Sequence, residues 1–593
     1  MSRLLQYLLL ASVASGVAAC GGGGGGSDST SNSSSLSSSS SSKSSSTSSS
    51  ASSSSSSSTS SSTSSASSST SSIDRSGAWP AAALNDTAVA GKEPAYPSTV
   101  CATLSATLTQ NAKGLLDDAV DASTANSKPD ASRIQAAIDA CSGGAVKLVT
   151  GSGGQNAFLT GPITLKSNVV LWVDAGVTVF ASRNPADYQI SGKNNCGENA
   201  SSDNGCNALI TATSTTNSGV MGEGTIDGRG GAVLTNGAYA GKLTWWDVGA
   251  LTKTMSTNQN NPRLIQVKGG SNFTVYKITL QNAPKFHLVP SDVDTVTVWG
   301  IKVLTPTLAY SVPGYACNAA DMPTVSGTPN TTRASTCFTP DTTKNTDAVD
   351  PGQSKNVLIA FNHISTGDDG VAIKAHTTLV SQNIQILHNR FYFTHGMSIG
   401  SETDTGVNGV TVRDLTIDGN DANFAVGIRI KTDDSRGGEV KNVTYDGVCI
   451  RRAQEALTLD TYYGDAYGKT VYPNIHDITI RNVHYVDMPG SIYNGGNVWL
   501  TLRGYNATYP LNAVTLDNVV FDSTPSWKTT SLATPIPSFS TVAMGPGPVS
   551  FANLLLGSSG SNSFTVVDSR SSSAAAYDCG SAFVPFPSSR SPI

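Results

Sequence analysis

The sequence predicts an all-β protein that folds as a single-stranded, right-handed parallel β-helix with a short N-terminal capping helix. Three observations predict this fold. Short apolar runs with a period of two recur along the chain at intervals typical of one solenoid turn. Turn residues, and no alternating helices, separate the runs, whereas a β-sandwich would show shorter intervals linked by hairpins. One amphipathic helix precedes the strands, where the open end of a solenoid needs a cover.

Residues 1–19 have the pattern of a secretory signal peptide. Arg3 precedes an apolar run from Leu4 to Val17, and this run is too short and wrongly flanked for a transmembrane helix. Residues 17–20, Val-Ala-Ala-Cys, also resemble the lipobox of bacterial lipoproteins, in which the cysteine is lipidated. We therefore expect an extracytoplasmic protein, either lipid-anchored to the bacterial cell envelope through Cys20 or cleaved and released.

Residues 20–75 predict a disordered linker. A run of glycines and an almost pure serine tract contain too few apolar residues to offset the entropy lost on ordering. We expect residues 76–593 to form one β-helical domain. A lipid anchor followed by this linker would hold the domain away from a membrane surface, which suits a large polymeric substrate.

Between residues 77 and 150 the pattern favours one helix and then strands. In residues 131–140 apolar side chains lie three and four apart, and Asp130 stands where an N-cap is expected. The period then changes to two. The first predicted strands are 146–149, 168–173 and 177–180.

Eight later segments repeat one sequence pattern, in which a polar residue precedes two short runs of alternating apolar and polar residues. They begin at residues 273, 296, 357, 384, 410, 443, 477 and 514. Neighbouring starts lie 23 to 37 residues apart, with a single exception of 61 residues. The long interval contains Tyr310–Asp341, rich in Pro, Thr, Gly and Ala, which we interpret as a loop inserted into one turn.

The cysteines predict disulfides. Nine cysteines behind an export signal favour an oxidising compartment. Eight remain when Cys20 is set aside, and their spacing alone does not determine the pairing. Cys196/Cys206 and Cys317/Cys337 each bracket a polar loop, so we predict these two pairs first.

Charge and composition exclude one class of partner. The formal net charge is −5 and aromatic residues make up 7% of the 593 residues. Proteins that bind nucleic acid usually present a basic face. We therefore expect no nucleic-acid partner, and we expect a monomer.

One polar group arrives per turn between residues 344 and 431. If each turn adds a strand to a parallel sheet, successive turns lie about 4.8 Å apart and residues at one angular position form a column. Arg429 and Lys431 are two residues apart, so on a strand they point to the same side. The predicted column contains Asp347, Asp368, Asp369, His395, Arg429 and Lys431.

The three aspartates suit the hydrolysis of a glycosidic bond. This reaction uses one carboxyl group as an acid and a second to activate water or to attack. Crowding of like charges raises at least one pKa, which keeps an acid protonated. Asp368 and Asp369 can both reach a cleft only if the backbone bends, and the flanking Gly367 and Gly370 make a bend plausible.

The other members of the column suit an acidic polymer. Arg429 can hold a carboxylate by two hydrogen bonds and Lys431 adds a charge beside it. His395 could tune the acid from a tight turn. Each feature also has a plainer interpretation, because Asp-Asp-Gly is commonly a solvated turn, a single histidine is commonly structural and Arg-Ile-Lys commonly marks an exposed strand. The stacking of all of them favours a hydrolytic site.

These residues resemble the sequence blocks of polygalacturonases, glycoside hydrolase family 28. The matching blocks are Asn345-Thr346-Asp347, Gly367-Asp368-Asp369, His395-Gly396-Met397-Ser398-Ile399-Gly400-Ser401 and Arg429-Ile430-Lys431, in this order. The resemblance covers residues 101–521, including 222–230 and 261–265. It implies a pectin-lyase-like solenoid and an enzyme that hydrolyses the α-1,4 bonds of homogalacturonan (polygalacturonate) with inversion.

The resemblance also implies a role for each site residue. Asp368 is the general acid, Asp347 and Asp369 activate water, and His395 assists the acid. The implied substrate-binding residues are Asn345, Arg429, Lys431 and Tyr463. An inverting enzyme should carry its carboxyl groups about 6.5–9.5 Å apart. Neither a metal nor a cofactor is implied.

Bacterial members of the family further imply the disulfides Cys101/Cys141 and Cys196/Cys206, which leaves Cys449 and Cys579. The chain departs from the family pattern at Thr394, where glycine is usual, and in the insertion at residues 310–341. The insertion leaves endo and exo action open, and we expect endo action.

Four alternatives remain at this stage. An exo-polygalacturonase and a rhamnogalacturonan hydrolase would share the fold. A rhamnogalacturonan hydrolase need not bind a carboxylate on both sides of the cleaved bond, so Arg429 with Lys431 favours homogalacturonan. A pectate lyase would require Ca²⁺ and an arginine base. A non-catalytic polysaccharide-binding β-helix would require no acid at all.

Overall fold

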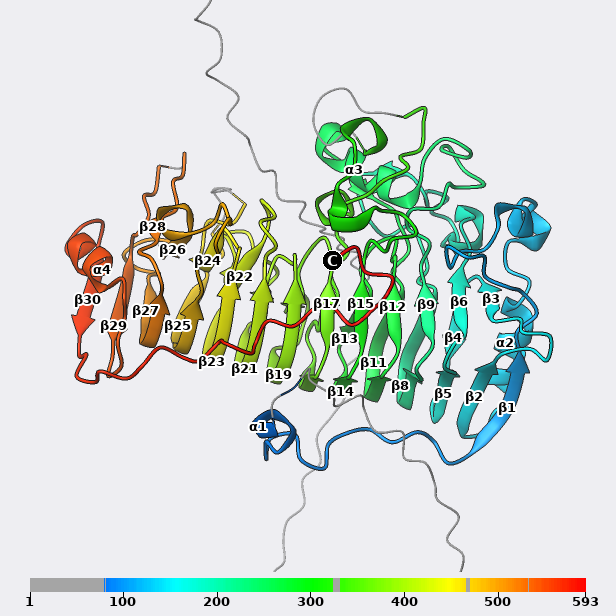
Figure 1. Ribbon diagram of the computed structural model, residues 1–593, viewed down its shortest axis with the longest axis horizontal. Coiled ribbons are helices and arrows are strands. Elements are labelled where there is room, and N and C mark those ends of the chain that lie inside the picture. The colour runs from blue at the N-terminus through cyan, green and yellow to red at the C-terminus, as the bar shows by residue number, and fades with distance from the viewer. Residues whose placement is uncertain (1–78, 80, 324–330, 465–469, 532) are drawn as a thin grey trace, which may run out of the picture.

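The protein is a parallel β-helix (Figure 1). The computed structural model describes residues 79, 81–323, 331–464, 470–531 and 533–593. The signal peptide, Cys20 and the linker 20–75 lie outside the described residues, and so does part of the insertion at 310–341. Within the described residues, no helix combines the length and the apolar character that crossing a membrane requires.

Two long parallel sheets form the walls of the solenoid. One contains β1 (Val100–Ser105), β2 (Gly144–Val149), β3 (Ala157–Thr160), β4 (Ile163–Leu165), β5 (Val169–Val173), β6 (Thr178–Ala181), β8 (Ile210–Met221), β9 (Thr225–Asp227), β11 (Ile265–Tyr276), β12 (Thr279–Gln281), β13 (Leu288–Ser291), β14 (Asp294–Trp299), β15 (Lys302–Leu304), β16 (Lys355–Ala360), β17 (His363–Ser365), β19 (Ser381–Tyr392), β21 (Val407–Asp418), β23 (Glu439–Arg451), β25 (Asn474–Tyr485), β27 (Leu511–Phe521), β29 (Ser540–Met544) and β30 (Phe564–Asp568). The other contains β18 (Val371–Ile373), β20 (Met397–Ile399), β22 (Val426–Lys431), β24 (Glu455–Asp460), β26 (Trp499–Arg503) and β28 (Ser526–Trp527). Outside them lie the antiparallel pair β7 (Asn199–Ala200) and β10 (Asn258–Gln259) and the helices α1 (Ala81–Leu84), α2 (Ala131–Ala140), α3 (Trp245–Met255) and α4 (Ala552–Ser558).

The predicted repeats pair in register. One continuous row of paired residues consists of Phe273, Val296, Val357, Ile384, Val410, Val443, Ile478 and Val514. All eight are buried, so they form one stack inside the solenoid. The predicted all-β parallel β-helix is confirmed. Seven of the eight repeat starts lie in this row, and the seventh repeat begins at Ile478, one residue later than predicted.

The residue before each member of this row is a left-handed position inside its strand. It has a positive φ in Asn272, Thr295, Asn356, Asn383, Gly409, Asn442, Asp477 and Ala513, as it does in Asn168 and Asn217 of earlier turns. Asparagine and glycine tolerate this left-handed conformation best. The amide of Asn272 donates to Asn217 at 2.7 Å, and that of Asn383 donates to Asn356 at 2.6 Å. We call the asparagines among them, Asn168, Asn217, Asn272, Asn356, Asn383 and Asn442, the amide column.

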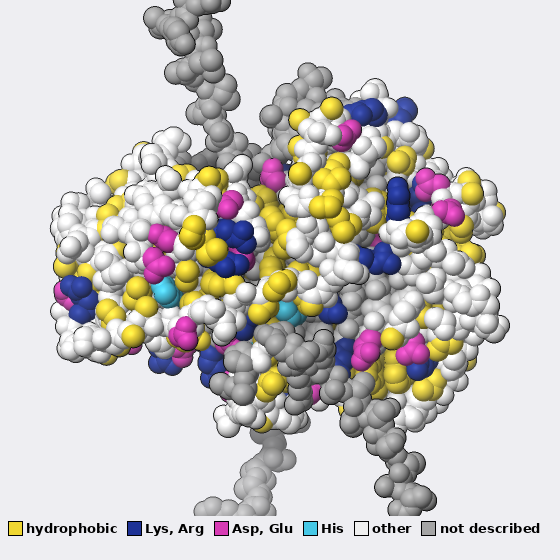
Figure 2. All heavy atoms as spheres, in the orientation of Figure 1, with side chains coloured by type: hydrophobic (Ala, Val, Ile, Leu, Met, Phe, Trp, Pro, Cys, Tyr) yellow, Lys and Arg dark blue, Asp and Glu magenta, His cyan; other side chains and the backbone are white. Residues whose placement is uncertain are grey.

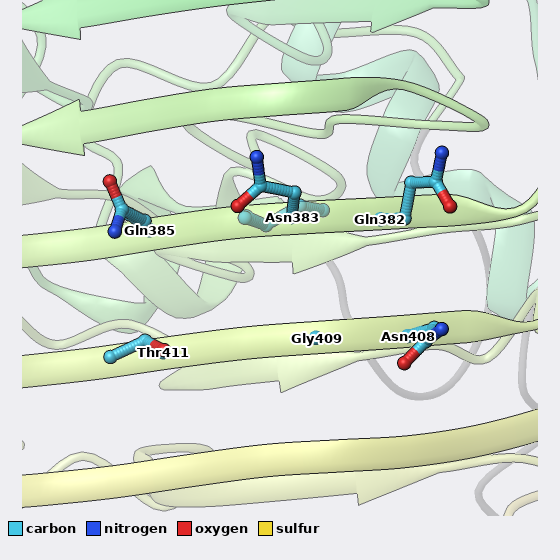
Figure 3. Close-up of a pocket in the computed structure, with 7 residues that line it drawn as sticks. Gln382, Asn383, Gln385, Asn408, Gly409 and Thr411 are labelled. Carbon is cyan, nitrogen blue, oxygen red and sulfur yellow. The ribbon is translucent and has the colours of Figure 1, made fainter.

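The amide column lies on an exposed surface. Figure 3 shows Gln382, Asn383 and Gln385 on one strand beside Asn408 and Thr411 on the next, and a shallow depression lies between them. The residues that line this depression are uncharged. It therefore offers no acid or base for chemistry.

Helix α2 has the predicted bounds and covers the first strands. Its buried Ile134 and Ile138 face the core, and α2 packs on β1, β2 and β4. Asp130 occupies the predicted N-cap position, but its side chain makes no capping hydrogen bond. The carboxylate of Asp130 instead accepts from the side chain of Arg133 at 2.7 Å and from the backbone N–H of Leu159 at 2.7 Å, so it ties the helix to β3.

Two terminal segments lie along the outside of the solenoid. Near the N-terminus, Trp79, Ala83 and Val89 pack on an outward-facing apolar patch that includes Trp299 and Phe361. The C-terminal segment after β30, red in Figure 1, runs back along the strands toward the middle of the molecule. Both segments shield apolar surface from water.

Four disulfides are present in the described residues. They join Cys101 to Cys141, Cys196 to Cys206, Cys317 to Cys337 and Cys449 to Cys579. The last one attaches the C-terminal segment to β23.

The described part of the insertion packs against α3. The rings of Tyr310 and Phe338 lie 5.6 and 4.9 Å from the ring of Trp246. The insertion and α3 together form the bulge above the strands in the green region of Figure 1.

Figure 2 shows one face of the molecule, on which lysine and arginine side chains occur in small separate groups mixed with acidic ones. This face has no continuous basic surface of the kind that nucleic-acid binding uses.

Candidate active site

The sheet of β18, β20 and β22 brings the predicted site residues together. Val371 pairs with Met397, Met397 pairs with Ile428, and an isolated bridge joins Val371 to Val349 one turn earlier. Each site residue lies on or just before one of these paired segments, so the register stacks them. We call Asp347, Asp368, Asp369, His395, Arg429 and Lys431 the charged column.

Asp368 is held by His395 and lies near Asn345. The Nδ1 atom of His395 lies 2.8 Å from a carboxylate oxygen of Asp368, and the side-chain amide of Asn345 lies 3.5 Å from the other oxygen. Burial acts to raise the pKa of Asp368, but His395 and the charges of Lys431 and Arg429 together hold that pKa below its ordinary value. In the ligand-free protein Asp368 is therefore a carboxylate with the ring of His395 as its close partner.

Asp369 is surrounded by donors. Lys431 Nζ lies 2.8 Å from one carboxylate oxygen, while Arg429 and Ser398 donate to the other. Burial acts to raise the pKa of Asp369, but the charges of Lys431 and Arg429 hold it below its ordinary value. Asp369 is thus a fixed carboxylate, as a group that accepts a proton from water must be.

Asp347 has the opposite electrostatic balance. It is buried, and its closest cation, Lys374, lies 3.8 Å away and is bound more tightly to Asp350 at 2.9 Å. Burial raises the pKa of Asp347 well above its ordinary value, and the charges of Asp350 and Asp368 add to this effect. Burial also raises the pKa of Asp350, to about 6, against the opposing charge of Lys374. The raised pKa expected from crowding thus belongs to Asp347 and Asp350 and not to Asp368.

Tyr463 lies beside the two cations. Its ring centre is 4.9 Å from Lys431 Nζ and 5.9 Å from the guanidinium carbon of Arg429. These distances fit cation–π contacts, which hold both cations at the edge of the column. The structure therefore brings all eight predicted site residues into one place.

The glycines around Asp368 and Asp369 serve close packing. A side chain at Gly367 would collide with the carbonyl oxygen of Pro340 at 2.0 Å, and one at Gly370 would meet the ring of Phe391 at 2.6 Å. Neither glycine has a positive φ. They are required by lack of space, and the expected bend does not depend on a left-handed backbone.

Thr394 also fits its position. Its side-chain oxygen accepts from the backbone N–H of Gly396 at 3.1 Å, so a threonine can stabilise the turn that carries His395.

Sequence reasoning missed four residues of the site. Ser398 bridges Asp369 and Arg429, and Gln259 donates to Asn345 at 2.9 Å. Lys374 and Asp350 adjoin Asp347. The bridge between Val349 and Val371 places Asp350 and Lys374 on neighbouring turns, but the sequence does not reveal the face to which they point.

Three potential metal ligands converge in the described part of the site. Side-chain atoms of Asp368, Asp369 and His395 lie within 4.8 Å of one another. The protein itself supplies a close partner to each carboxylate, namely the ring of His395 for Asp368 and the cations Arg429 and Lys431 for Asp369. The arrangement therefore suits proton transfer.

The chain is similar to known enzymes over most of its length. It is 49% identical over 505 residues to a polygalacturonase of Ralstonia solanacearum, covering 84% of this chain and 92% of that protein. It is 40% identical over 406 residues to an endo-polygalacturonase of Pectobacterium carotovorum subsp. carotovorum, covering 68% of this chain and 87% of that protein.

Among solved structures, the polygalacturonase of Erwinia carotovora ssp. carotovora aligns with a TM-score of 0.59 at 36% identity, covering 74% of this chain and 97% of that one. The model of the glycosyl hydrolases family 28 matches residues 163–540, a range that contains the whole charged column. The chain therefore belongs to glycosyl hydrolases family 28.

Proposed function

We propose that this enzyme is an endo-polygalacturonase that hydrolyses the α-1,4 bonds of homogalacturonan with inversion. The observation that carries the proposal is the charged column, in which three carboxylates stand beside an arginine and a lysine on consecutive turns. Carboxylates supply the acid and base of hydrolysis, and the cations suit the carboxylates of the substrate.

Asp368 is the general acid in this proposal. The Nδ1 atom of His395 lies 2.8 Å from a carboxylate oxygen of Asp368, so a proton can pass between these two atoms. When the leaving oxygen approaches Asp368, the proton passes through this carboxyl group to the oxygen, and the sugar–oxygen bond breaks. His395 thereby assists the acid as its closest side-chain partner.

Asp369 and Asp347 activate the water that attacks the opposite face of the sugar. Lys431 and Arg429 hold the oxygens of Asp369 in place and keep this carboxylate ionised, so it can orient the water and accept a hydrogen bond from it. A substrate carboxylate near Arg429 would share this cation with Asp369, and Tyr463 would support both cations from the side. Asn345 completes the binding surface near Asp368.

Endo action is supported by one relative and by the fold. The Pectobacterium relative, 40% identical, bears the name endo-polygalacturonase. In addition, the sheet that carries the site continues on its C-terminal side through β24, β26 and β28, so a polymer can extend past the point of cleavage.

We propose an extracytoplasmic location and a monomeric state. The four disulfides favour an oxidising compartment. Cys20 is the proposed site of lipidation, and the mass of the mature N-terminal peptide distinguishes a lipidated cysteine from ordinary cleavage.

The test is the variant Asp368→Asn on polygalacturonate. We expect release of reducing sugar to fall by about 10²–10⁴-fold, as is typical when a general acid is lost, with circular dichroism and melting temperature close to wild type. An unchanged turnover number would contradict the assignment of Asp368.

The product sizes of the wild type test the mode of action, since long intermediate oligomers indicate internal cleavage and early monomer or dimer alone contradicts it. Unsaturated, ultraviolet-absorbing products would indicate a lyase.

A further inference from the structure

Two lysines occupy equivalent positions beside the charged column. The register of β18, β20 and β22 places Lys374 and Lys431 at the same strand position two turns apart, with Gly400 between them. Each directs its ammonium group to an aspartate proposed to activate water. Lys431 contacts Asp369 at 2.8 Å, and Lys374 contacts Asp347 at 3.8 Å.

The two lysines differ in what else they bind. Lys374 is drawn toward Asp350, whose carboxylate lies 2.9 Å away. Asp347 and Asp350 are both buried, and each has one carboxylate oxygen without a hydrogen-bond partner among the described residues. Two buried acids therefore compete for a single nearby ammonium group.

The surroundings of Lys374 leave it as the main source of positive charge for this pair. The acidic groups that act on it are Asp350, Glu402 and Asp347, and its ammonium lies 4.8 Å from the ring centre of Phe286. Beyond Phe286, Lys285 is neutralised by Asp203 at 2.7 Å. On the other side of Asp347 stand Asp368 and Asp369, which act on it as further negative charges.

We propose that Lys374 is a positioning residue that favours the ionised form of Asp347, and that Asp350 opposes it by competing for the same ammonium group. The proposal rests on the proposed function, in which Asp347 must be a carboxylate in order to accept a proton from water. Lys374 and Asp350 together then set the lowest pH at which the enzyme works.

The mechanism is a balance of charges. A positive group within about 4–6 Å favours the ionised form of a carboxylate, and a negative group disfavours it. Without Lys374, the Asp347–Asp350 pair takes up its first proton at a higher pH. Without Asp350, Lys374 is free to approach Asp347, which then stays ionised to a lower pH.

The test compares the pH dependence of kcat/KM on polygalacturonate in three variants. We expect Lys374→Met to move the acidic limb to higher pH by about one unit, with the plateau near that of wild type. Asp350→Asn should move the same limb to lower pH. Lys374→Arg keeps the charge and should leave the limb close to that of wild type.

Lys147 offers a matched control. It pairs with Asp174 at 3.1 Å and lies 4.4 Å from the ring centre of Trp172, and its side chain is 24% exposed against 22% for Lys374. Lys147→Met should therefore have a similar structural cost and leave the acidic limb unmoved.

The shifts of the acidic limb either support or contradict the proposed role of Lys374. Shifts of opposite sign in Lys374→Met and Asp350→Asn support the proposal, and an unmoved limb or a uniform loss at every pH overturns it. If Lys374→Met does not fold, Asp350→Asn and Lys374→Arg still carry the test. An inactive wild type at every pH would contradict the proposed function, whereas an active wild type with unmoved limbs contradicts only the role of Lys374.

Discussion

The amide column and the charged column are produced by the same winding of the chain, yet they behave differently. In the amide column, similar neutral side chains such as Asn356 and Asn383 bond to each other on an exposed surface. In the charged column, chemically different residues such as Asp369 and Lys431 meet in a buried place. Successive turns about 4.8 Å apart bring neighbours together in both cases.

The difference teaches that stacking alone does not make a site. Exposed amides satisfy one another and remain in contact with water, so their column stabilises the register. Buried carboxylates lose hydration, and each one needs a compensating partner. Where the partners are ample, as around Asp369, the pKa falls, and where they are shared, as around Asp347, the pKa rises.

The largest expected effect comes from breaking the charged column at Asp369. Asp369→Asn leaves Arg429 and Lys431 without their carboxylate, and we expect kcat to fall by about 10²–10⁴-fold. Reducing-sugar assays at saturating polygalacturonate measure this loss.

Asp121→Asn is the matched control, because Asp121 is also buried between two cations, Arg183 at 2.8 Å and Arg229 at 2.6 Å, but lies in the N-terminal part of the solenoid. We expect it to lower the melting temperature with little change in kcat. Equal losses of kcat in both variants would show that Asp369 acts only through stability.

The second prediction concerns the pH dependence of stability. The pKa of Asp350 is about 6 in the folded protein and 3.8 is its ordinary value. Between these values the folded protein binds more protons than the unfolded chain, so the contribution of Asp350 to stability is lost as the pH rises from about 4 to above 6. The pH-dependent part amounts to about 3 kcal/mol.

Asp350→Asn removes this contribution. The free energy of unfolding of the variant, relative to wild type, should therefore increase as the pH rises through this range. Denaturant unfolding at several pH values measures the difference, and a difference that stays constant would contradict the prediction.

The smallest effect is expected in the amide column. Asn383→Ala forces alanine into a left-handed conformation at φ 55° and removes the bond to Asn356, which should cost about 1–2 kcal/mol of stability. Activity should not change, since the column lies outside the site. Asn383→Gly relieves the backbone and loses only the amide, so it should cost less, and an equal cost would assign the effect to the hydrogen bond alone.

The fold was predictable from sequence because its period is local. Each repeat contains its own alternation, and a parallel sheet then requires the repeats to align. The repeat that begins at Ile478 was placed one residue early because Asp477 was taken as its first residue, whereas Asp477 is a left-handed residue of β25 and Ile478 is the paired one. The side chain of Asp130 makes no capping hydrogen bond because it accepts instead from the backbone N–H of Leu159, 29 residues away in the chain, a donor that is visible only after folding.

The members of the charged column could be predicted as a group from the sequence. Which of the carboxylates has a raised pKa and which a lowered one could not be predicted. The grouping follows from one polar residue per turn. The pKa values depend on which carboxylate obtains which cation, and this depends on distances of 2.8 and 3.8 Å to two lysines at equivalent positions. Lys374 and Asp350 escaped notice because neither spacing nor residue type distinguishes a lysine that faces the site from one that faces solvent.

The C-terminal segment gives the solenoid a property that its strands lack. It is bonded covalently to β23 through Cys579, and farther on Arg590 donates to Gln110 at 3.2 Å while its carbonyl accepts from Leu308 at 2.9 Å. The C-terminal segment thereby connects late, middle and early turns of the solenoid. Terminal repeats of a solenoid can ordinarily unfold locally. Here the C-terminal segment connects the last turns to the first ones, so local unfolding at one end is coupled to unfolding of the whole solenoid.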